Sequence, residues 1–230
     1  MPSVSFTQLS DRLKDLDELN KAHGLFTRGQ RGRQWFTVPL NRSAVVLMCA
    51  HFEGFLEDLF MECVDFLRNS AVAVDRLPRK LRVAQVETKL SEASEALTRT
   101  ERFTKLVEAF ALAEPLFTPG RQVQPGDLNP KLVVEGFANP SSDRIDWLFD
   151  FLEIRAQVEG ISWRKASKAS VRSNIDKMVE TRNDIAHGKV GVMVRKADVT
   201  RYRKYVTGFA ESLDEILGTK LETVTGRQPW

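Results

Sequence analysis

The 230-residue sequence lacks the features that several classes of protein require. Its apolar runs fall short of the roughly 20 residues that cross a bilayer, and its first residues lack the basic and apolar regions of a secretory signal. The two cysteines, Cys49 and Cys63, fall in one expected helix about 21 Å apart, which is too far for a disulfide. We therefore expect a soluble, cytoplasmic chain that does not associate with membranes.

Metal-binding and phosphate-binding motifs are missing as well. The sequence has three histidines, His23, His51 and His187, and no Cys-x-x-Cys or His-x-x-x-His spacing. A protein-bound zinc or iron ion is therefore not expected. No glycine-rich phosphate loop is present in the sequence. An enzyme with this sequence is expected to use general acid–base groups and fixed positive charge, without a metal or another cofactor.

The residues that are present favour an all-α chain with a substantial core. Hydrophobic residues make up 42% of the sequence and charged residues 28%, a balance that excludes wholesale disorder. Apolar residues recur at three- and four-residue steps through most of the chain, as they do in amphipathic helices. Helices are expected at residues 5–22, 41–68, 78–97, 100–113, 143–154, 173–187 and 198–217.

Local signals set the expected ends of three of these helices. The His23-Gly24 pair is expected to end the first helix. The helix that ends near residue 187 is expected to begin at Ser173, where an acidic residue follows three positions on, or earlier, near Ser170. Asp198 is expected to cap the last helix.

The middle of the chain has a different composition. Residues 115–142 contain five of the nine prolines together with several glycines, which predicts a long loop or insertion. Brief extended pieces are expected at residues 132–134 and 190–194. Neither side of the loop obviously holds a complete core, so we expect a single domain over residues 1–230, with 70–142 as a variable helical insertion and loop.

The helix before Gly188 carries an arginine where its apolar pattern calls for leucine. Arg182 lies in the middle of the face formed by Ile175, Met178, Val179, Ile185 and Ala186. An unpaired buried charge is strongly destabilising, so Arg182 must be paired or must line a polar cavity. One interpretation is a structural ion pair with an acid of a neighbouring helix, with Glu53, Asp146 and Asp150 as candidates.

Two more residues of this helix favour a functional interpretation. Asn183 and His187 are four residues apart and share a face, whereas Arg182 and His187 lie about 140° apart around the helix. Together the three place a fixed cation, an amide and a proton-transferring side chain within about one and a half turns. Taken alone, a histidine just before Gly188 is also typical of a helix C-terminal cation.

These residues resemble a known motif. The segment Arg-Asn-Asp-Ile-Ala-His-Gly at 182–188 is similar to the Arg-[Asn/Asp/His]-x(n)-His signature of the HEPN superfamily, small helical domains that include many ribonuclease toxins. The Phe-Glu-Gly-Phe stretch at 52–55 resembles the early helix of its RiboL-PSP-HEPN branch. The likeness covers residues 41–68, 143–154 and about 170–217. It implies a HEPN-type helical bundle that forms a homodimer, with the motifs of two subunits lining one cleft.

The resemblance implies a metal-independent endoribonuclease, a hydrolase acting as a toxin or phage-defence effector. His187 would act as general base toward the ribose 2′-OH or as acid toward the leaving 5′-oxygen, and Arg182 would bind the scissile phosphate. Asn183 would orient His187 or a phosphate oxygen. Glu53 would hold Arg182 or His187 in place, and the alternative is that Glu53 is a surface carboxylate. The need for a 2′-OH predicts RNA as the substrate, with a 2′,3′-cyclic phosphate product.

The distribution of charge favours phosphate binding near this motif. Residues 163–207 carry 12 Lys and Arg against 4 Asp and Glu, a net charge of +8, while the whole chain has only +3. Lys189 and Arg172 are expected to contact RNA. Three arginines of an expected loop, Arg28, Arg31 and Arg33, are further candidates for phosphate contacts. The alternative is a basic helical face that is simply solvated.

Two functions without catalysis also fit the sequence. In the first, the motif would only bind RNA or a nucleotide. In the second, the chain would be a protein-interaction module in which Arg182 forms a buried ion pair. A toxin would have an antitoxin or a regulatory protein as a further partner. The large aromatic side chains are expected to lie in the core and not to stack on bases: Trp35, Trp147, Trp163 and Phe52.

Overall fold

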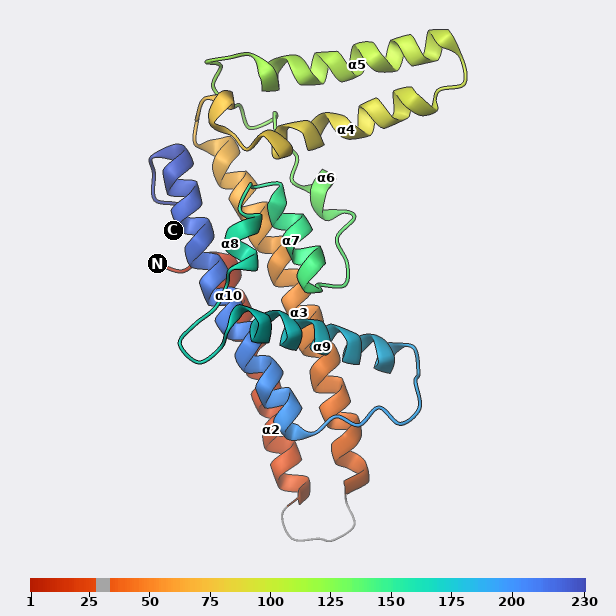
Figure 1. The fold of residues 1–230 in the computed structure, drawn as a ribbon, viewed down its shortest axis with the longest axis vertical. Coiled ribbons are helices and arrows are strands. Elements are labelled where there is room, and N and C mark those ends of the chain that lie inside the picture. Colours follow the sequence, from red (N-terminus) through yellow and green to blue (C-terminus); the bar gives the residue numbers. More distant parts are fainter. Residues whose placement is uncertain (28–33) are drawn as a thin grey trace. The chain divides into compact units, whose positions relative to one another are not determined.

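A computed structural model describes residues 1–27 and 34–230, without the side chains of residues 20, 22–27 and 34–36. The described residues form helices and no strand (Figure 1), so the all-α prediction is confirmed. None of the described helices is both long enough and apolar enough to span a membrane. The described chain divides into two compact units, each built from three segments. The single-domain organisation over 1–230 stays a prediction.

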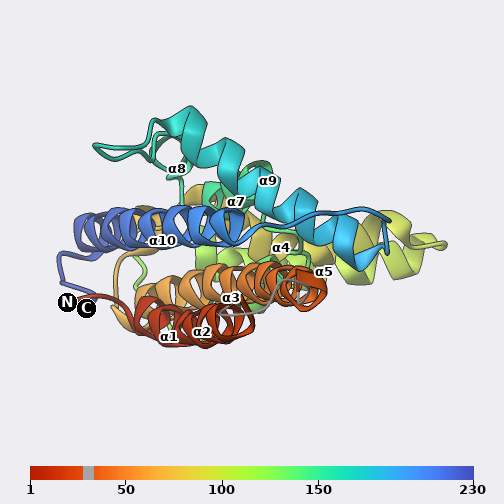
Figure 2. The same ribbon diagram turned by 90° about the horizontal axis from the view of Figure 1, so that it is seen from below.

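The first unit carries the Arg182 motif. It comprises Met1–Leu59, Ala138–Ile145 and Ala156–Ile216. Its helices are α1 (Val4–Arg12), α2 (Lys14–Thr27), the first part of α3 (Gln34–Asn69), the start of α7 (Ser142–Asp150), most of α8 (Arg155–Glu159), α9 (Lys168–Ala186) and most of α10 (Lys196–Thr225). Figure 2 shows α10 between α9 on one side and α1, α2 and the start of α3 on the other.

Aromatic side chains form the centre of this unit. Phe52 is fully buried, and its ring contacts Phe209 edge to face, 5.8 Å between centroids, and stacks on Phe55 at 6.4 Å. Because α3 and α10 each contribute a ring, the aromatic contacts hold the helix that carries the Phe-Glu-Gly-Phe stretch against the last helix. The prediction that Phe52 lies in the core is confirmed.

The second unit contains a long helical hairpin. It comprises Phe60–Phe137, Asp146–Arg155 and Leu217–Trp230. Besides the ends of α3, α7 and α10 it holds the 3-10 turn η1 (Val74–Arg76), α4 (Arg79–Glu95), α5 (Arg99–Phe117) and α6 (Lys131–Val134). Helices α4 and α5 run antiparallel and contact each other along the hairpin (Figure 1).

Three helices begin at serine or threonine caps, as helix-start chemistry predicts. The Ser3 hydroxyl accepts the backbone N–H of Phe6 at 3.0 Å before α1, and Thr98 accepts that of Glu101 at 3.1 Å before α5. Before α9 the cap is Ser167, not Ser170 or Ser173, so the predicted start of this helix was wrong. The Ser167 hydroxyl accepts the backbone N–H of Ser170 at 3.3 Å, so it caps the helix without an acidic residue three positions on.

Other predicted helix ends also needed correction. The first predicted helix is two helices that meet at Leu13, and α2 continues past Gly24 to Thr27. A single glycine inside a helix costs only about 1 kcal/mol relative to alanine, which packing can offset. Helix α5 likewise continues past Pro115. Asp198 does not cap α10; it lies in the first turn and accepts the backbone N–H of Arg195 at 3.0 Å.

The two predicted extended pieces are not strands. Residues 131–134 form the short helix α6. Residues 190–194 are irregular, and their carbonyl groups are bound by side chains of α3. The Asn41 amide donates to the Val194 carbonyl at 2.9 Å, and the Arg42 guanidinium donates to that of Val192 at 2.9 and 2.6 Å. Side chains thus satisfy this backbone in place of a neighbouring strand.

Candidate functional site

Helix α9 directs Arg182 toward the interior of the first unit. Ile175, Met178 and Val179, one and two turns earlier, are buried, whereas the Arg182 side chain keeps 28% of its surface exposed. The predicted apolar face ends here, because Ile185 is only half-buried and Ala186 is exposed. Arg182 therefore stands where the buried face of the helix meets solvent.

Three oxygen acceptors surround the Arg182 guanidinium. Its Nη1 donates to Oδ1 of Asn139 at 3.1 Å and to Oδ1 of Asn183 at 3.0 Å, and its Nη2 lies 3.6 Å from Oε2 of Glu53. Among the three acids considered from the sequence, Glu53 is the one that pairs with Arg182. Asp150 instead pairs with Lys80 at 2.5 Å.

The Glu53 side chain is confined. It keeps 21% of its surface exposed, and its Oε2 atom is buried and accepts no hydrogen bond within the described chain. A distance of 3.6 Å gives an ion pair without a hydrogen bond. Consequently Nη2 of Arg182 keeps its hydrogen-bonding capacity for another acceptor.

Asn139 is a residue of the site that the sequence did not reveal. It has φ +57°, a left-handed conformation that asparagine tolerates better than most residues. Asp176 of α9 anchors the turn that follows, because its Oδ1 accepts the backbone N–H and the hydroxyl of Ser142 at 2.8 and 2.5 Å. The Asn-Pro pair at 139–140 signals a turn, but no sequence spacing links it to Arg182.

A buried thiol lies near the ion pair. Cys49 precedes Glu53 by one turn of α3 and is fully buried. Burial raises the pKa of the Cys49 thiol to about 11, while the Arg182 charge lowers it and Glu53 raises it further. The thiol is therefore neutral at physiological pH and adds no charge beside the guanidinium.

His187 differs from Arg182 in its surroundings. It caps the C-terminus of α9, where its backbone N–H donates to the Asn183 carbonyl at 2.9 Å, and Gly188 follows with φ +68°. The imidazole is exposed and makes no hydrogen bond or ion pair within the described residues. Its two nitrogens are thus available to a ligand.

Asn183 connects to the arginine and not to the histidine. Its side-chain oxygen accepts from Arg182, and its amide nitrogen donates to no group of the described chain. The structure therefore brings Arg182, Asn183 and Glu53 together, with Asn139 as a fourth member. His187 shares only backbone contacts with this cluster.

The cations around the motif are largely paired with acids. Lys189 lies 3.0 Å from Asp184, and Arg172 lies 3.2 Å from Asp143. Further pairs join Lys177 to Glu180, Arg201 to Asp198 and Arg203 to Asp17. The three loop arginines at 28, 31 and 33 lie outside the described residues.

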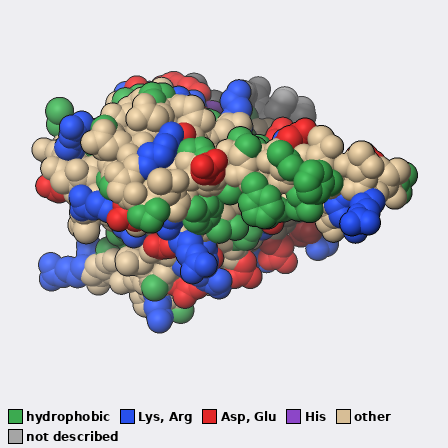
Figure 3. All heavy atoms as spheres, turned by 90° about the horizontal axis from the view of Figure 1, so that it is seen from above, with side chains coloured by type: hydrophobic (Ala, Val, Ile, Leu, Met, Phe, Trp, Pro, Cys, Tyr) green, Lys and Arg blue, Asp and Glu red, His purple; other side chains and the backbone are tan. Residues whose placement is uncertain are grey.

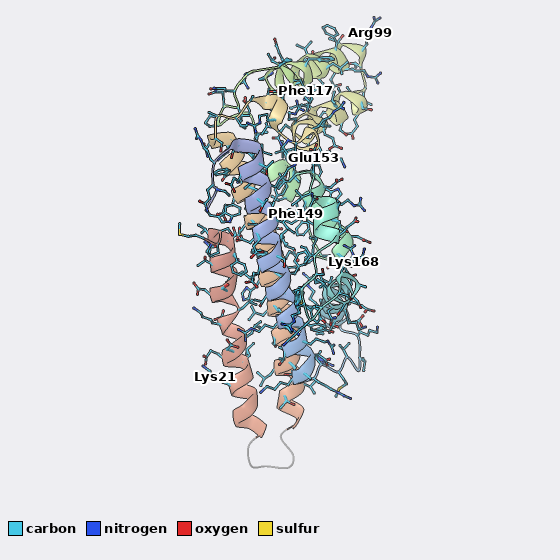
Figure 4. The ribbon with its side chains drawn as sticks, turned by 60° about the vertical axis from the view of Figure 1, so that its left-hand side comes forward. Lys21, Arg99, Phe117, Phe149, Glu153 and Lys168 are labelled. Atoms are coloured by element: carbon cyan, nitrogen blue, oxygen red, sulfur yellow. The ribbon has the colours of Figure 1, made fainter. Side chains whose placement is uncertain are left out.

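A second group of cations lies at the opposite end of α9. Arg164 and Lys165 occupy a tight turn closed by Trp163 and Ala166, and Lys168 (labelled in Figure 4) is the first residue of the helix. All three cations are exposed and form no ion pair within the described chain. The rise of α9 places Lys168 about 28 Å from His187.

The remaining predicted aromatic and metal features have mixed outcomes. Trp163 is half-buried against Tyr205, 5.6 Å between ring centroids, whereas Trp147 is 36% exposed, so its assignment to the core was wrong. Trp35 lies among the side chains that are not described. Within the described residues no three His, Cys, Asp or Glu side chains form a group that could hold a metal ion.

Comparison with protein families assigns the chain. The RiboL-PSP-HEPN family model matches residues 7–219. The chain belongs to this family. HEPN domains are typically ribonucleases, often of toxin and defence systems; they bind RNA and often dimerise. The match includes residues 70–142, which the motif resemblance did not cover. No curated protein sequence and no solved structure gives a match.

Proposed function

We propose that this RiboL-PSP-HEPN chain is a metal-independent endoribonuclease in which Arg182 binds the scissile phosphate and His187 transfers the proton. The observation that supports this most is the contrast between the two side chains. Three acceptors hold the Arg182 guanidinium in place, while the His187 imidazole is exposed and unpartnered within the described chain. A fixed cation beside an open proton carrier suits acid–base cleavage of a phosphodiester.

In the proposed reaction, His187 accepts the proton of the ribose 2′-OH while the 2′-oxygen attacks phosphorus. The bond between phosphorus and the 5′-oxygen breaks, and that oxygen takes a proton from an acid. In a homodimer whose two motifs line one cleft, His187 of the second copy is that acid. The products are a 2′,3′-cyclic phosphate and a free 5′-OH, so the substrate must be RNA.

Neighbouring residues hold the arginine ready for this step. Asn139 and Asn183 occupy Nη1, so Nη2 is the group that donates to the phosphate. The unused amide nitrogen of Asn183 is a second donor. Glu53 offsets the charge of Arg182 when no RNA is bound. A guanidinium positioned before substrate arrives needs little reorganisation during the reaction.

RNA binding is proposed to extend along α9. Lys189 and Arg172 remain candidate contacts, although each is partly neutralised by an acid. Arg164, Lys165 and Lys168 carry uncompensated charge and would bind phosphates several nucleotides from the cleavage point. By membership of its family, we propose a toxin or defence role, with an antitoxin or regulatory protein restraining the activity.

The test is cleavage of end-labelled RNA by the purified protein in the presence of EDTA. We expect wild type to cleave and to leave a 2′,3′-cyclic phosphate, and His187→Ala and Arg182→Ala to lose at least about 100-fold in rate. Lys177→Ala, on the same helix and paired with Glu180, is the matched control and should retain most activity. A single 2′-deoxy substitution at the cleavage point should block the reaction.

Two outcomes would contradict the proposal. Cleavage that requires a divalent metal would exclude this mechanism. Wild type that binds RNA without cutting it, with binding unchanged in His187→Ala, would indicate the non-catalytic RNA-binding module in its place.

A further inference from the structure

The α4–α5 hairpin of the second unit has a polar network on one side. Lys89 of α4 lies 3.0 Å from Glu92 and 3.6 Å from Glu108 of α5, and Lys105 lies 2.8 Å from Glu92. These ion pairs link the two helices along one edge. They involve four charged side chains of the hairpin and none of its apolar ones.

Large apolar side chains are exposed elsewhere on the same hairpin. On α5, Phe103 and Phe110 are each 69% exposed, Val107 is 52% exposed and Phe117 is 43% exposed. Val83 and Leu90 on α4 are 44% and 45% exposed. Figure 3 shows hydrophobic side chains gathered over the hairpin. Soluble monomers rarely expose a contiguous apolar patch of more than a few hundred Å².

The exposed residues of α5 follow the spacing of a helix–helix contact. Phe103, Val107, Phe110, Glu114 and Phe117 recur at steps of four, three, four and three, as the a and d positions of a coiled coil do. We call the four apolar members the outer seam of α5. A second seam of the same helix is already buried, with Ala109 and Leu116 at a spacing of seven. Helix α5 thus has the sequence of a helix with neighbours on two sides.

We propose that the outer seam of α5 binds the outer seam of a second copy of this chain, with the two helices antiparallel. If the two-fold axis passes midway between Val107 and Phe110, Val107 of one copy lies opposite Phe110 of the other. In the same register Phe117 of one copy comes opposite Thr100 of the other. A hollow lies at that place, where Arg99 and Arg102 line the pocket together with Leu97, Thr98, Thr100, Phe103 and Leu106. In this register Phe103 of one copy comes opposite Glu114 of the other, so the apolar self-complementarity rests on Val107, Phe110 and Phe117.

The charges of α5 select the antiparallel orientation. Arg99 lies at its N-terminal end and Glu114 near its C-terminal end, both on the side of the outer seam. Figure 4 labels Arg99 and Phe117, which mark the two ends of the helix. Antiparallel pairing brings Arg99 of one copy within about one turn of Glu114 of the other, whereas parallel pairing sets like charges side by side.

The exposed area is sufficient for a specific dimer. Phenylalanine side chains offer roughly 150–250 Å² each, so the outer seam together with Val83 and Leu90 exposes about 600 Å² per copy. A symmetric contact would then bury about 1,200 Å² in total, the lower limit of specific protein interfaces. The inference concerns association alone and does not depend on cleavage of RNA.

Sedimentation equilibrium of the full chain tests this interface. We expect the sedimenting mass of wild type, at 26.1 kDa per chain, to exceed that of the seam variant below, whether or not the Arg182 motifs form a dimer of their own. Phe110→Glu places a carboxylate in the seam and should raise the dimer Kd by at least about 30-fold. Leu112→Glu is the matched control, because Leu112 is 45% exposed and lies about 160° further round the same helix. This control should dimerise as wild type does.

Circular dichroism keeps the test independent of folding, since both glutamate variants alter exposed positions and should keep the helical spectrum of wild type. A second experiment tests orientation: Arg99→Glu and Glu114→Arg should each weaken the dimer about threefold or more, and the double variant should restore it. Wild type that is monomeric, or a Phe110→Glu dimer as tight as wild type, would overturn the interface. Failure of the double variant to restore dimerisation would overturn the antiparallel orientation.

Discussion

Helices α9 and α5 both depart from the rule that apolar side chains face inward and charges outward, and they depart in opposite directions. Helix α9 turns Arg182 toward the interior, and α5 turns Phe103 and Phe110 toward solvent. The arginine is compensated within the chain by Glu53 and two asparagine side chains. The phenylalanines stay 69% exposed. The proposals follow this difference: the arginine that the chain itself pairs is assigned to the site, and the exposed phenylalanines are assigned to an interface with a second copy.

Two substitutions test the ion pair between Arg182 and Glu53: one removes the arginine, and the other then removes the charge of its unpaired partner. Arg182→Ala leaves Glu53 buried without its cation and should lower the free energy of unfolding by about 2 kcal/mol, less than a fully buried pair because both side chains keep some exposure. Arg182→Ala combined with Glu53→Gln removes the unpaired charge and should recover most of that stability. Chemical denaturation of the three proteins measures the difference.

Catalysis should respond differently to the same variants. The proposed phosphate contact is lost in both the single and the double variant, so RNA cleavage should stay at least about 100-fold below wild type in each. If the double variant is as unstable as the single one, Glu53 does not compensate Arg182. If the double variant recovers cleavage, Arg182 has only a structural role.

The basic residues of the first unit also fall into a paired and an unpaired group, and we expect smaller effects from changing them. Arg164, Lys165 and Lys168 are uncompensated, whereas Lys177, Lys189 and Arg201 each face an acid. When log affinity for single-stranded RNA is plotted against log salt concentration, the triple alanine variant of Arg164, Lys165 and Lys168 should have a slope smaller in magnitude by about 2. The triple alanine variant of the paired cations is the control and should change it less. Equal changes would show that local pairing does not decide RNA binding.

Several features of the site were predictable because they follow from one helix. The apolar pattern of α9 identified Arg182 as misplaced and required an acid for it. The pattern did not choose among Glu53, Asp146 and Asp150, since that choice depends on how α3 and α9 pack. The predicted start of α9 was wrong for a local reason: Asp176 follows Ser173 by three positions and favours it as the cap, whereas no acidic residue follows the actual cap, Ser167, at that spacing.

Features that depend on distant contacts were not predictable. The alternation in residues 190–194 indicated a strand, but the segment is held by Asn41 and Arg42, about 150 positions away in the sequence. The two faces of α5 could not be separated without its partner α4, because both faces of that helix are apolar in sequence. Asn139 lies 43 residues before Arg182 in an irregular segment, where no periodicity relates the two.

Substitution of Asn139 has the smallest predicted effect. Two variants distinguish the role of its left-handed backbone in the turn from the role of its side-chain oxygen as an acceptor for Arg182. Asn139→Ala puts the left-handed φ on a residue that tolerates it less well than asparagine, and it removes a hydrogen bond, so it should destabilise the chain by about 1–2 kcal/mol. Asn139→Gly removes the same acceptor without backbone strain and should melt close to wild type. If Asn139 positions Arg182, both variants should lose about tenfold in RNA cleavage despite their different stabilities. Loss of activity in the alanine variant alone would show that the turn, and not the amide, is what the site requires.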